Sequence, residues 1–269
     1  MQLRLLCVGD VVGAPGRRVL RAGLEAIVPA RKIDCVIVNA ENAAGGSGLT
    51  ASLYEKIIEH GTHLITMGDH VYRRREVISI LENADNIVRP ANLPAEAPGR
   101  QFAIYETVSG HHVAVVSVLG RLFMRLTADC PFAAADRVLA AIPKHVKIIV
   151  VDIHAEATSE KIAMGWHLDG RVSAVLGTHT HVPTADERVL PKGTAYITDL
   201  GMTGPYDSVL GRVKERVVRA LVTAVPNRFE VATGDIRLCG VIVCVDTTTG
   251  LATSIERIRF DGTDETESS

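Results

Sequence analysis

Acidic, amide and imidazole side chains follow five apolar runs of this sequence, at the points where β-strands are expected to end. Carboxylate and amide oxygens and imidazole nitrogens are the donors that bind first-row transition metals. Eight such groups are too many for one ion, but they suit two ions about 3.5–4 Å apart, the usual arrangement for phosphoryl displacement. The candidate residues are Asp10, Glu41, Asn42, Asp69, His70, His154, His179 and His181.

Local spacing supports a shared site. The carboxyl ends of parallel strands share one edge of a sheet, so groups spread over about 170 positions are expected to converge there. His179 and His181 are two residues apart, and in an extended backbone both imidazoles would point the same way. Glu41 and Asn42 are adjacent, so they can serve one site only from a bend, which the glycines within 45–48 permit. Glycines also precede the candidate ligands and would let the backbone approach the ions; they are Gly9, Gly68 and Gly177.

Each residue also has a structural interpretation. Asp10 taken alone is typical of a helix N-cap, Glu41 of a solvated loop charge, and His154 of a hydrogen-bonded core histidine. Independent caps and loop charges have no reason to gather at one edge, so the joint placement favours a metal site. The other histidines are interpreted as structural. The arginines at 73–75 are interpreted as the exposed start of a helix rather than as a site for an anionic substrate.

The elements that must position these residues alternate between strands and helices, which predicts an α/β fold with crossover helices. Strands are expected at 3–8, 35–38, 63–67, 101–108, 112–119, 146–153, 172–176, 195–198, 237–246 and 253–260. Helices are expected at 17–28, 50–60, 73–81, 132–142, 159–167 and 210–225. We expect a single domain, 1–260, built as a two-sheet sandwich flanked by helices, and a flexible tail over 261–269.

Composition excludes several classes of protein. Apolar residues make up 47% and charged residues 22% of the 269 positions, an ordinary globular composition. The net charge of −2 argues against a duplex nucleic acid or anionic membrane partner, and aromatic residues at 4% leave little surface for base stacking. No apolar window is long enough to span a bilayer. The five cysteines include no Cys-x-x-Cys pair and are interpreted as buried, reduced thiols, which suits a cytoplasmic protein.

Several motifs resemble those of the calcineurin-like metallophosphoesterases. They are Gly-Asp at 9–10, Gly-x-His at 68–70 and Gly-x-His-x-His at 177–181, with His154 between the last two. Three longer segments resemble the YmdB-like branch of bacterial phosphodiesterases: GDVVG at 9–13, NAENAAGG at 39–46 and GMTGPYDS at 201–208. The resemblance runs from Leu3 to about Phe260, so it implies calcineurin-like architecture for nearly the whole chain.

The resemblance also implies roles for the candidate residues. One metal would be held by Asp10, Glu41, Asn42 and His181. The second would be held by Glu41, Asp69, His154 and His179, with Glu41 as the bridge. His70 would lie beside the ions as general acid or leaving-group stabiliser. The superfamily has a metal-binding histidine where this chain has Val12, and Asn42 is expected to take its place.

Substrate and cofactor follow from the same resemblance. It implies a homo-oligomer, a dimer or a tetramer, that hydrolyses phosphodiesters, notably 2′,3′-cyclic nucleotides. Mixed oxygen and imidazole donors favour iron or manganese, with zinc as the alternative. We expect two ions to produce a bridging hydroxide that attacks phosphorus, while His70 assists the leaving oxygen.

One residue departs from the family pattern: Asp69 stands where the family has asparagine. The added carboxylate lowers the net charge of the site by one, which predicts tighter metal binding or another metal preference, with altered turnover. It also keeps open a metal- and nucleotide-binding regulatory protein with little turnover. A dinucleotide-binding oxidoreductase is less favoured, because the glycines within 9–16 lack the Gly-x-Gly-x-x-Gly spacing and Asp10 would repel a pyrophosphate.

Overall fold

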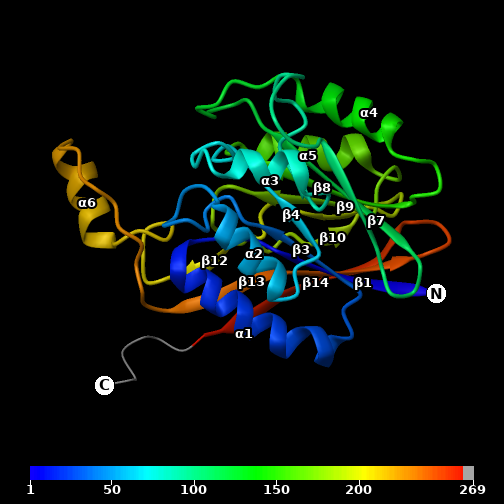
Figure 1. Ribbon diagram of the computed structural model, residues 1–269, viewed down its shortest axis with the longest axis horizontal. Coiled ribbons are helices and arrows are strands. Elements are labelled where there is room, and N and C mark those ends of the chain that lie inside the picture. Colours follow the sequence, from blue (N-terminus) through cyan, green and yellow to red (C-terminus); the bar gives the residue numbers. More distant parts are fainter. Residues whose placement is uncertain (263–269) are drawn as a thin grey trace.

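Two β-sheets pack face to face, and helices cover their outer surfaces (Figure 1). The computed structural model describes residues 1–262. The first sheet runs in the order β2-β12-β13-β1-β3-β4-β5, with β14 paired to β13. Its strands are β1 (Gln2–Val8), β2 (Asp10–Val11), β3 (Cys35–Asn39), β4 (Leu64–Thr66), β5 (Ile87–Val88), β12 (Met202–Pro205), β13 (Ile236–Asp246) and β14 (Ala252–Asp261).

The second sheet runs in the order β10-β11-β9-β8-β7-β6. Its strands are β6 (Phe102–Glu106), β7 (His112–Leu119), β8 (Ile148–His154), β9 (Ala174–Thr178), β10 (Arg188–Val189) and β11 (Ala195–Ile197). In each sheet the central strands are parallel: β1, β3, β4 and β5 in the first, and β7, β8, β9 and β11 in the second. Both sheets therefore have an edge at which several strands end together.

Helices pack on the outer face of each sheet because their apolar sides meet apolar strand residues. The first sheet carries α1 (Gly13–Arg31), α2 (Ala51–Glu59) and α3 (Val77–Asn83), and the second carries α4 (Pro131–Ala141) and α5 (Thr158–Leu168). Thr50 caps α2, accepting a hydrogen bond from the Leu53 amide as expected for a threonine at this position. The last helix, α6 (Lys214–Thr223), projects from the body (Figure 1).

Alternate residues of one strand face different layers of the core. In β1, Leu5 and Cys7 lie between the two sheets, whereas Leu6 and Val8 pack toward the helices. The central parallel strands are buried on both sides, which is why they read as continuous apolar runs rather than as alternating patterns. The apolar layer between the sheets fixes the orientation of one sheet relative to the other. It therefore also fixes the positions of the carboxyl ends of the parallel strands.

The predicted α/β fold with two sheets and flanking helices is confirmed. The helix expected at 73–81 begins only at Val77, and the one expected at 210–225 is confined to 214–223. Four strands of two to four residues, β2, β5, β10 and β12, were not expected, because so few residues carry no periodic pattern. The single domain, 1–260, stays a prediction. The tail expected over 261–269 lies mostly outside the described residues; Asp261 ends β14.

Two further expectations concerned membrane-spanning segments and the cysteines. In the part of the chain that the structure describes, no helix has the length and apolar character that crossing a bilayer requires. All five cysteines are unpaired. Cys7, Cys35 and Cys239 are buried as expected, whereas Cys130 is exposed and Cys244 is half-buried.

Candidate metal centre

The eight predicted side chains meet where the parallel strands of both sheets end. The first sheet supplies one set, from β2 and from the turns after β3 and β4: Asp10, Glu41, Asn42, Asp69 and His70. The second sheet supplies the other, from the end of β8 and the turn after β9: His154, His179 and His181. The expectation that one edge of a single sheet would hold them all was wrong, because strand ends of both sheets contribute to the site.

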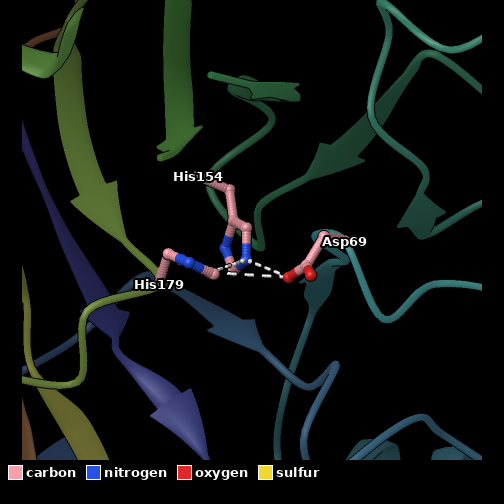
Figure 2. A group of neighbouring side chains, drawn as sticks. All are labelled: Asp69, His154 and His179. Carbon is pink, nitrogen blue, oxygen red and sulfur yellow. Dashed lines mark hydrogen bonds and ion pairs between the residues drawn. The ribbon is translucent and has the colours of Figure 1, made fainter. Parts of the chain in front are cut away.

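Asp69, His154 and His179 form one compact group of donors (Figure 2). His154 Nε2 lies 3.1 Å from Asp69 Oδ1 and 3.1 Å from His179 Nδ1, and His179 Nδ1 lies 3.4 Å from Asp69 Oδ1. Donors that bind a first-row metal at about 2.0–2.2 Å in tetrahedral or octahedral geometry lie about 3.0–3.5 Å from one another. The three donor atoms therefore already have the spacing of a coordination shell.

A second group of donors adjoins the first and contains Asp10, Asn42 and His181. Asn42 Nδ2 lies 3.4 Å from Asp10 Oδ1 and 3.2 Å from His181 Nε2, and His181 Nε2 lies 3.8 Å from Asp10 Oδ1. His181 Nδ1 donates a hydrogen bond to the Leu210 carbonyl at 3.2 Å, which leaves Nε2 unprotonated and facing the cluster, where it accepts from Asn42.

Glu41 lies between the two groups. Its Oε1 is 3.3 Å from His154 Nε2 and 3.3 Å from Asn42 Nδ2, and its Oε2 accepts the backbone amide of His70 at 3.0 Å. The glutamate is about 1% exposed, so its carboxylate can be neutralised only by groups of the site. This placement is what a bridging ligand requires.

Asn42 presents its amide nitrogen, not its oxygen, to Asp10 and His181. The oxygen Oδ1 instead accepts a hydrogen bond from His70 Nδ1 at 2.7 Å. Rotation by 180° about the Cβ–Cγ bond would turn the oxygen toward Asp10 and release His70. Binding a cation through Asn42 therefore requires that this amide turn.

Buried negative charge dominates the electrostatics of the cluster. Burial raises the pKa of Asp10 from 3.8 to about 7. Burial acts in the same direction on Glu41 and Asp69, but contact with His154 brings the pKa of both carboxyls below their usual range. Burial alone would lower the pKa of His154, but Glu41 raises it well above the usual value. Protons on imidazoles thus balance carboxylates here, a role that a bound cation can take over.

We expected His179 and His181 to lie on an extended backbone, but the structure places them in a turn. Both residues have positive φ, 95° and 66°, a conformation that costs non-glycine residues free energy and is concentrated at functional sites. The two imidazoles still reach the cluster, but they do so from a tight turn. The His179 amide also donates to Asp10 Oδ2 at 3.2 Å, which ties this turn to the first sheet.

That turn is held by a buried ion pair which the sequence reasoning missed. Thr180, between the two histidines, donates to Asp199 Oδ2 from its amide (3.2 Å) and its hydroxyl (2.7 Å). Lys161 Nζ of α5 donates to the same oxygen at 2.6 Å, and both Lys161 and Asp199 are fully buried. A lysine within the apolar side of a helix was the available signal.

Asp152 is a second missed residue, and it orients His154. His154 Nδ1 donates to Thr178 Oγ1 at 2.8 Å, and the Thr178 hydroxyl donates to Asp152 Oδ1 at 2.5 Å. This chain of hydrogen bonds places the Nδ1 proton away from the cluster and turns Nε2 toward it, as partners of metal-bound histidines do. Asp152 precedes His154 by two residues in an otherwise apolar strand, so both face the same side, and that spacing was the signal.

We expected Gly9, Gly68 and Gly177 to let the backbone come close to the ions, but only Gly68 is in close contact with candidate ligands. A Cβ on Gly68 would overlap both His154 Nε2 and Glu41 Oε2. For Gly9 and Gly177 the atoms that a Cβ would overlap are carbonyl oxygens of the adjacent chain, those of Gly201 and Thr198, so those two glycines serve backbone packing instead.

Comparison with known proteins identifies relatives that match nearly the whole chain. A family model described as "YmdB-like protein" matches residues 6–258. A 2′,3′-cyclic-nucleotide 2′-phosphodiesterase of Bacillus subtilis (strain 168) is 46% identical over 256 residues, 95% of this chain and 96% of that protein. The resemblance found in the sequence is therefore confirmed.

Two solved structures share the fold. A hypothetical protein from Thermus thermophilus aligns with a TM-score of 0.90 at 41% identity, over 97% of this chain and 100% of that one. A phosphatase from Mycoplasma pneumoniae aligns with a TM-score of 0.91 at 34% identity, over 99% of this chain and 96% of that one. The two-sheet fold is thus one that a solved phosphatase has.

Proposed function

This chain belongs to the family of YmdB-like proteins, and we propose that it is a metal-dependent phosphodiesterase that hydrolyses 2′,3′-cyclic nucleotides. The name of the Bacillus subtilis relative supports the substrate class. The observation that carries the proposal is the coordination-like spacing of Asp69, His154 and His179, from 3.1 to 3.4 Å between donor atoms. A metal site of this kind suits hydrolysis of a phosphodiester, because the bound cations attract the anionic phosphate.

We assign two cations to the cluster. Asp10, Glu41, Asn42 and His181 would hold the first. Glu41, Asp69, His154 and His179 would hold the second. Bound there, divalent ions would supply charge stabilisation and a water acidic enough to serve as nucleophile near neutral pH. The mixture of oxygen and imidazole donors favours iron or manganese, with zinc as the alternative.

The residues of the chain have separate tasks in this proposal. The turn at His179–His181 and the carboxylates of the first sheet would hold the two ions. His70 is about a quarter exposed, so one face of its imidazole is accessible to a substrate. Its Nδ1 lies 3.2 Å from Glu41 Oε1, a contact that does not depend on the Asn42 amide, and this leaves Nε2 to donate to the leaving oxygen.

The test separates metal binding from proton transfer. Metal content and hydrolysis of adenosine 2′,3′-cyclic phosphate are measured for wild type, His179→Ala and His70→Ala. We expect His179→Ala to lose metal, and His70→Ala to keep metal while losing about 10²–10⁴-fold in kcat. Equal metal loss in both variants would overturn the assigned roles, and a fully loaded wild type without hydrolysis would overturn the function.

A regulatory protein that binds metal and nucleotide with little turnover is the second candidate. The observation that favours it is Asp69, because its carboxylate reduces the positive charge that would stabilise the transition state. Steady-state hydrolysis of bis-p-nitrophenyl phosphate with Mn²⁺ separates the candidates. Full metal occupancy without turnover would favour the regulator.

We also propose a cytoplasmic homo-oligomer, a dimer or a tetramer, without duplex nucleic acid or membrane partners. Unpaired cysteines and a net charge of −2 support the compartment and the absent partners. The projecting helix α6 supports the oligomer, because Leu221 and Val222 are 77% and 80% exposed. Light scattering of the double variant Leu221→Glu/Val222→Glu tests it: we expect a smaller species than wild type.

A further inference from the structure

A pocket of about 280 Å³ opens beside Asp69. Its walls are Asp69, Tyr72, Arg73, Arg125 and Leu126. Because Asp69 belongs to both the donor cluster and this pocket, a ligand bound at the metals would extend directly into it. None of the roles assigned above uses the other four residues.

Both arginines of the pocket stand on anchored backbone. Arg73 follows His70 in a turn, and its amide donates to the His70 carbonyl at 3.0 Å. Arg125 lies in the loop 120–130 between β7 and α4. Glu160 fixes the start of this loop by accepting the amides of residues 121 and 122 at 3.0 Å, and Asn92 fixes its end by donating to the carbonyl of residue 129 at 2.9 Å.

The loop 120–130 also bridges the two halves of the fold. It leaves a strand of the second sheet, yet Leu126 packs against the apolar cluster between the first sheet and its helices. Arg125 is thereby brought to the side of the site where Arg73 stands. The pocket exists because the second sheet's loop closes over the first sheet's turn.

The two arginines of this pocket form no ion pair with any carboxylate among residues 1–262, although Asp69 lines the same pocket. Within residues 1–262, neither the Arg73 nor the Arg125 guanidinium has an ion-pair or hydrogen-bond partner. A second pocket, of about 360 Å³, offers a contrast, because each of its three arginines is paired with a carboxylate: Arg237 with Asp235, Arg257 with Glu187 and Arg259 with Asp261. Free guanidiniums present a planar set of donors that matches phosphate.

We propose, resting on the phosphodiesterase function above, that this pocket binds a second phosphate of the substrate. The preferred substrates are then 2′,3′-cyclic nucleotides that carry a further phosphate on the 5′ side, either as a 5′-monoester or as the link to another nucleotide. The cyclic phosphodiester occupies the metal centre, and the 5′ phosphate lies between Arg73 and Arg125. The interpretation of the arginines at 73–75 as merely exposed then holds for Arg75 but not for Arg73, and all three precede the helix, which begins at Val77.

The experiment compares three substrates: adenosine 2′,3′-cyclic phosphate, its 5′-phosphorylated form, and the adenylyl dinucleotide with a 2′,3′-cyclic end. We expect wild type to prefer one or both phosphate-bearing substrates about tenfold or more in kcat/KM, the effect of about one charge-assisted hydrogen bond. Arg73→Ala and Arg125→Ala should each reduce that preference about tenfold. The two extended substrates distinguish a monoester from a diester.

Arg75→Ala is the matched control, because Arg75 is exposed in the same basic run and does not line the pocket. It should leave the preference unchanged. Absence of any preference in wild type would overturn the proposal, as would an equal loss of preference in Arg75→Ala, which would indicate nonspecific attraction.

Binding measurements keep the subsite testable if no substrate is turned over. Calorimetry on the manganese-loaded protein compares adenosine 3′,5′-bisphosphate with adenosine 3′-monophosphate. Tighter binding of the bisphosphate to wild type, lost in Arg73→Ala/Arg125→Ala, supports the subsite even if the phosphodiesterase function fails. Equal affinities for the two nucleotides would overturn the subsite and leave the function standing.

Discussion

Lys161 and Asp199 form a fully buried pair of opposite charges, whereas the cluster a few residues away gathers the carboxylates of Asp10, Glu41 and Asp69 around imidazoles. The pair needs nothing from outside the chain, since the ammonium and the carboxylate satisfy each other at 2.6 Å. The cluster is balanced only while imidazoles hold protons. The contrast shows which buried charge supports the structure and which is arranged to receive a cation.

Breaking the pair should have the largest effect. Lys161→Met leaves Asp199 buried without its partner, so we expect a loss of about 3–5 kcal/mol in the free energy of unfolding, measured by urea denaturation. The double variant Lys161→Met/Asp199→Asn removes the stranded charge, keeps a hydrogen-bond acceptor for Thr180, and should recover much of that loss. A cost below about 1 kcal/mol for the single variant would contradict the structural role.

The relay behind His154 should affect metal binding more than folding. Thr178→Val removes the hydroxyl between His154 and Asp152, so we expect metal affinity to fall about 10–100-fold, as loss of a partner of a metal-bound histidine does. Thr66→Val is the matched control, because Thr66 also donates to Asp152, at 2.6 Å, but has no hydrogen bond to His154. Equal losses of affinity in both variants would argue against a relay.

Replacing a carboxylate of the cluster should change stability in the direction opposite to breaking the pair. The folded pKa of Asp10, about 7, exceeds its unfolded value of 3.8, so its contribution to stability is present below pH 4 and is lost as the pH rises through 7. Metal-free Asp10→Asn at pH 8 should therefore melt a few degrees above metal-free wild type. With Mn²⁺ the order should reverse. Thermal melts with and without chelator measure both, and an unchanged order would contradict a cation site.

The smallest effect is expected at Asp69, where the family resemblance led us to expect asparagine. Asp69→Asn removes one negative charge while keeping an oxygen donor, so metal affinity and the rate of cyclic-nucleotide hydrolysis should each change by about tenfold or less. Elemental analysis and steady-state kinetics measure the two. Unchanged metal content together with an unchanged rate would show that the carboxylate has no special consequence.

The donor cluster could be predicted from the sequence, whereas the Lys161–Asp199 pair could not. Donors at strand ends were identifiable because they interrupt long apolar runs, and these runs also predicted the two sheets and their helices. For the buried pair, Lys161 had a signal because it lies on the apolar side of a helix, but nothing in the sequence identified Asp199 as its partner, since only packing brings the two together. The positive φ of His179 and His181 had no local signal either, because the turn is held by hydrogen bonds that Thr180 donates to the distant Asp199.

Position 68 places a limit on how this protein can evolve. Any replacement of Gly68 adds a carbon atom where His154 Nε2 and Glu41 Oε2 already stand, so the imidazole or the carboxylate must leave its place. Even alanine, the smallest replacement, would overlap both atoms, so no substitution at this position is expected to be tolerated. We expect a saturation library at this codon to return only glycine among active clones, and glycine to be retained at this position as the sequence evolves.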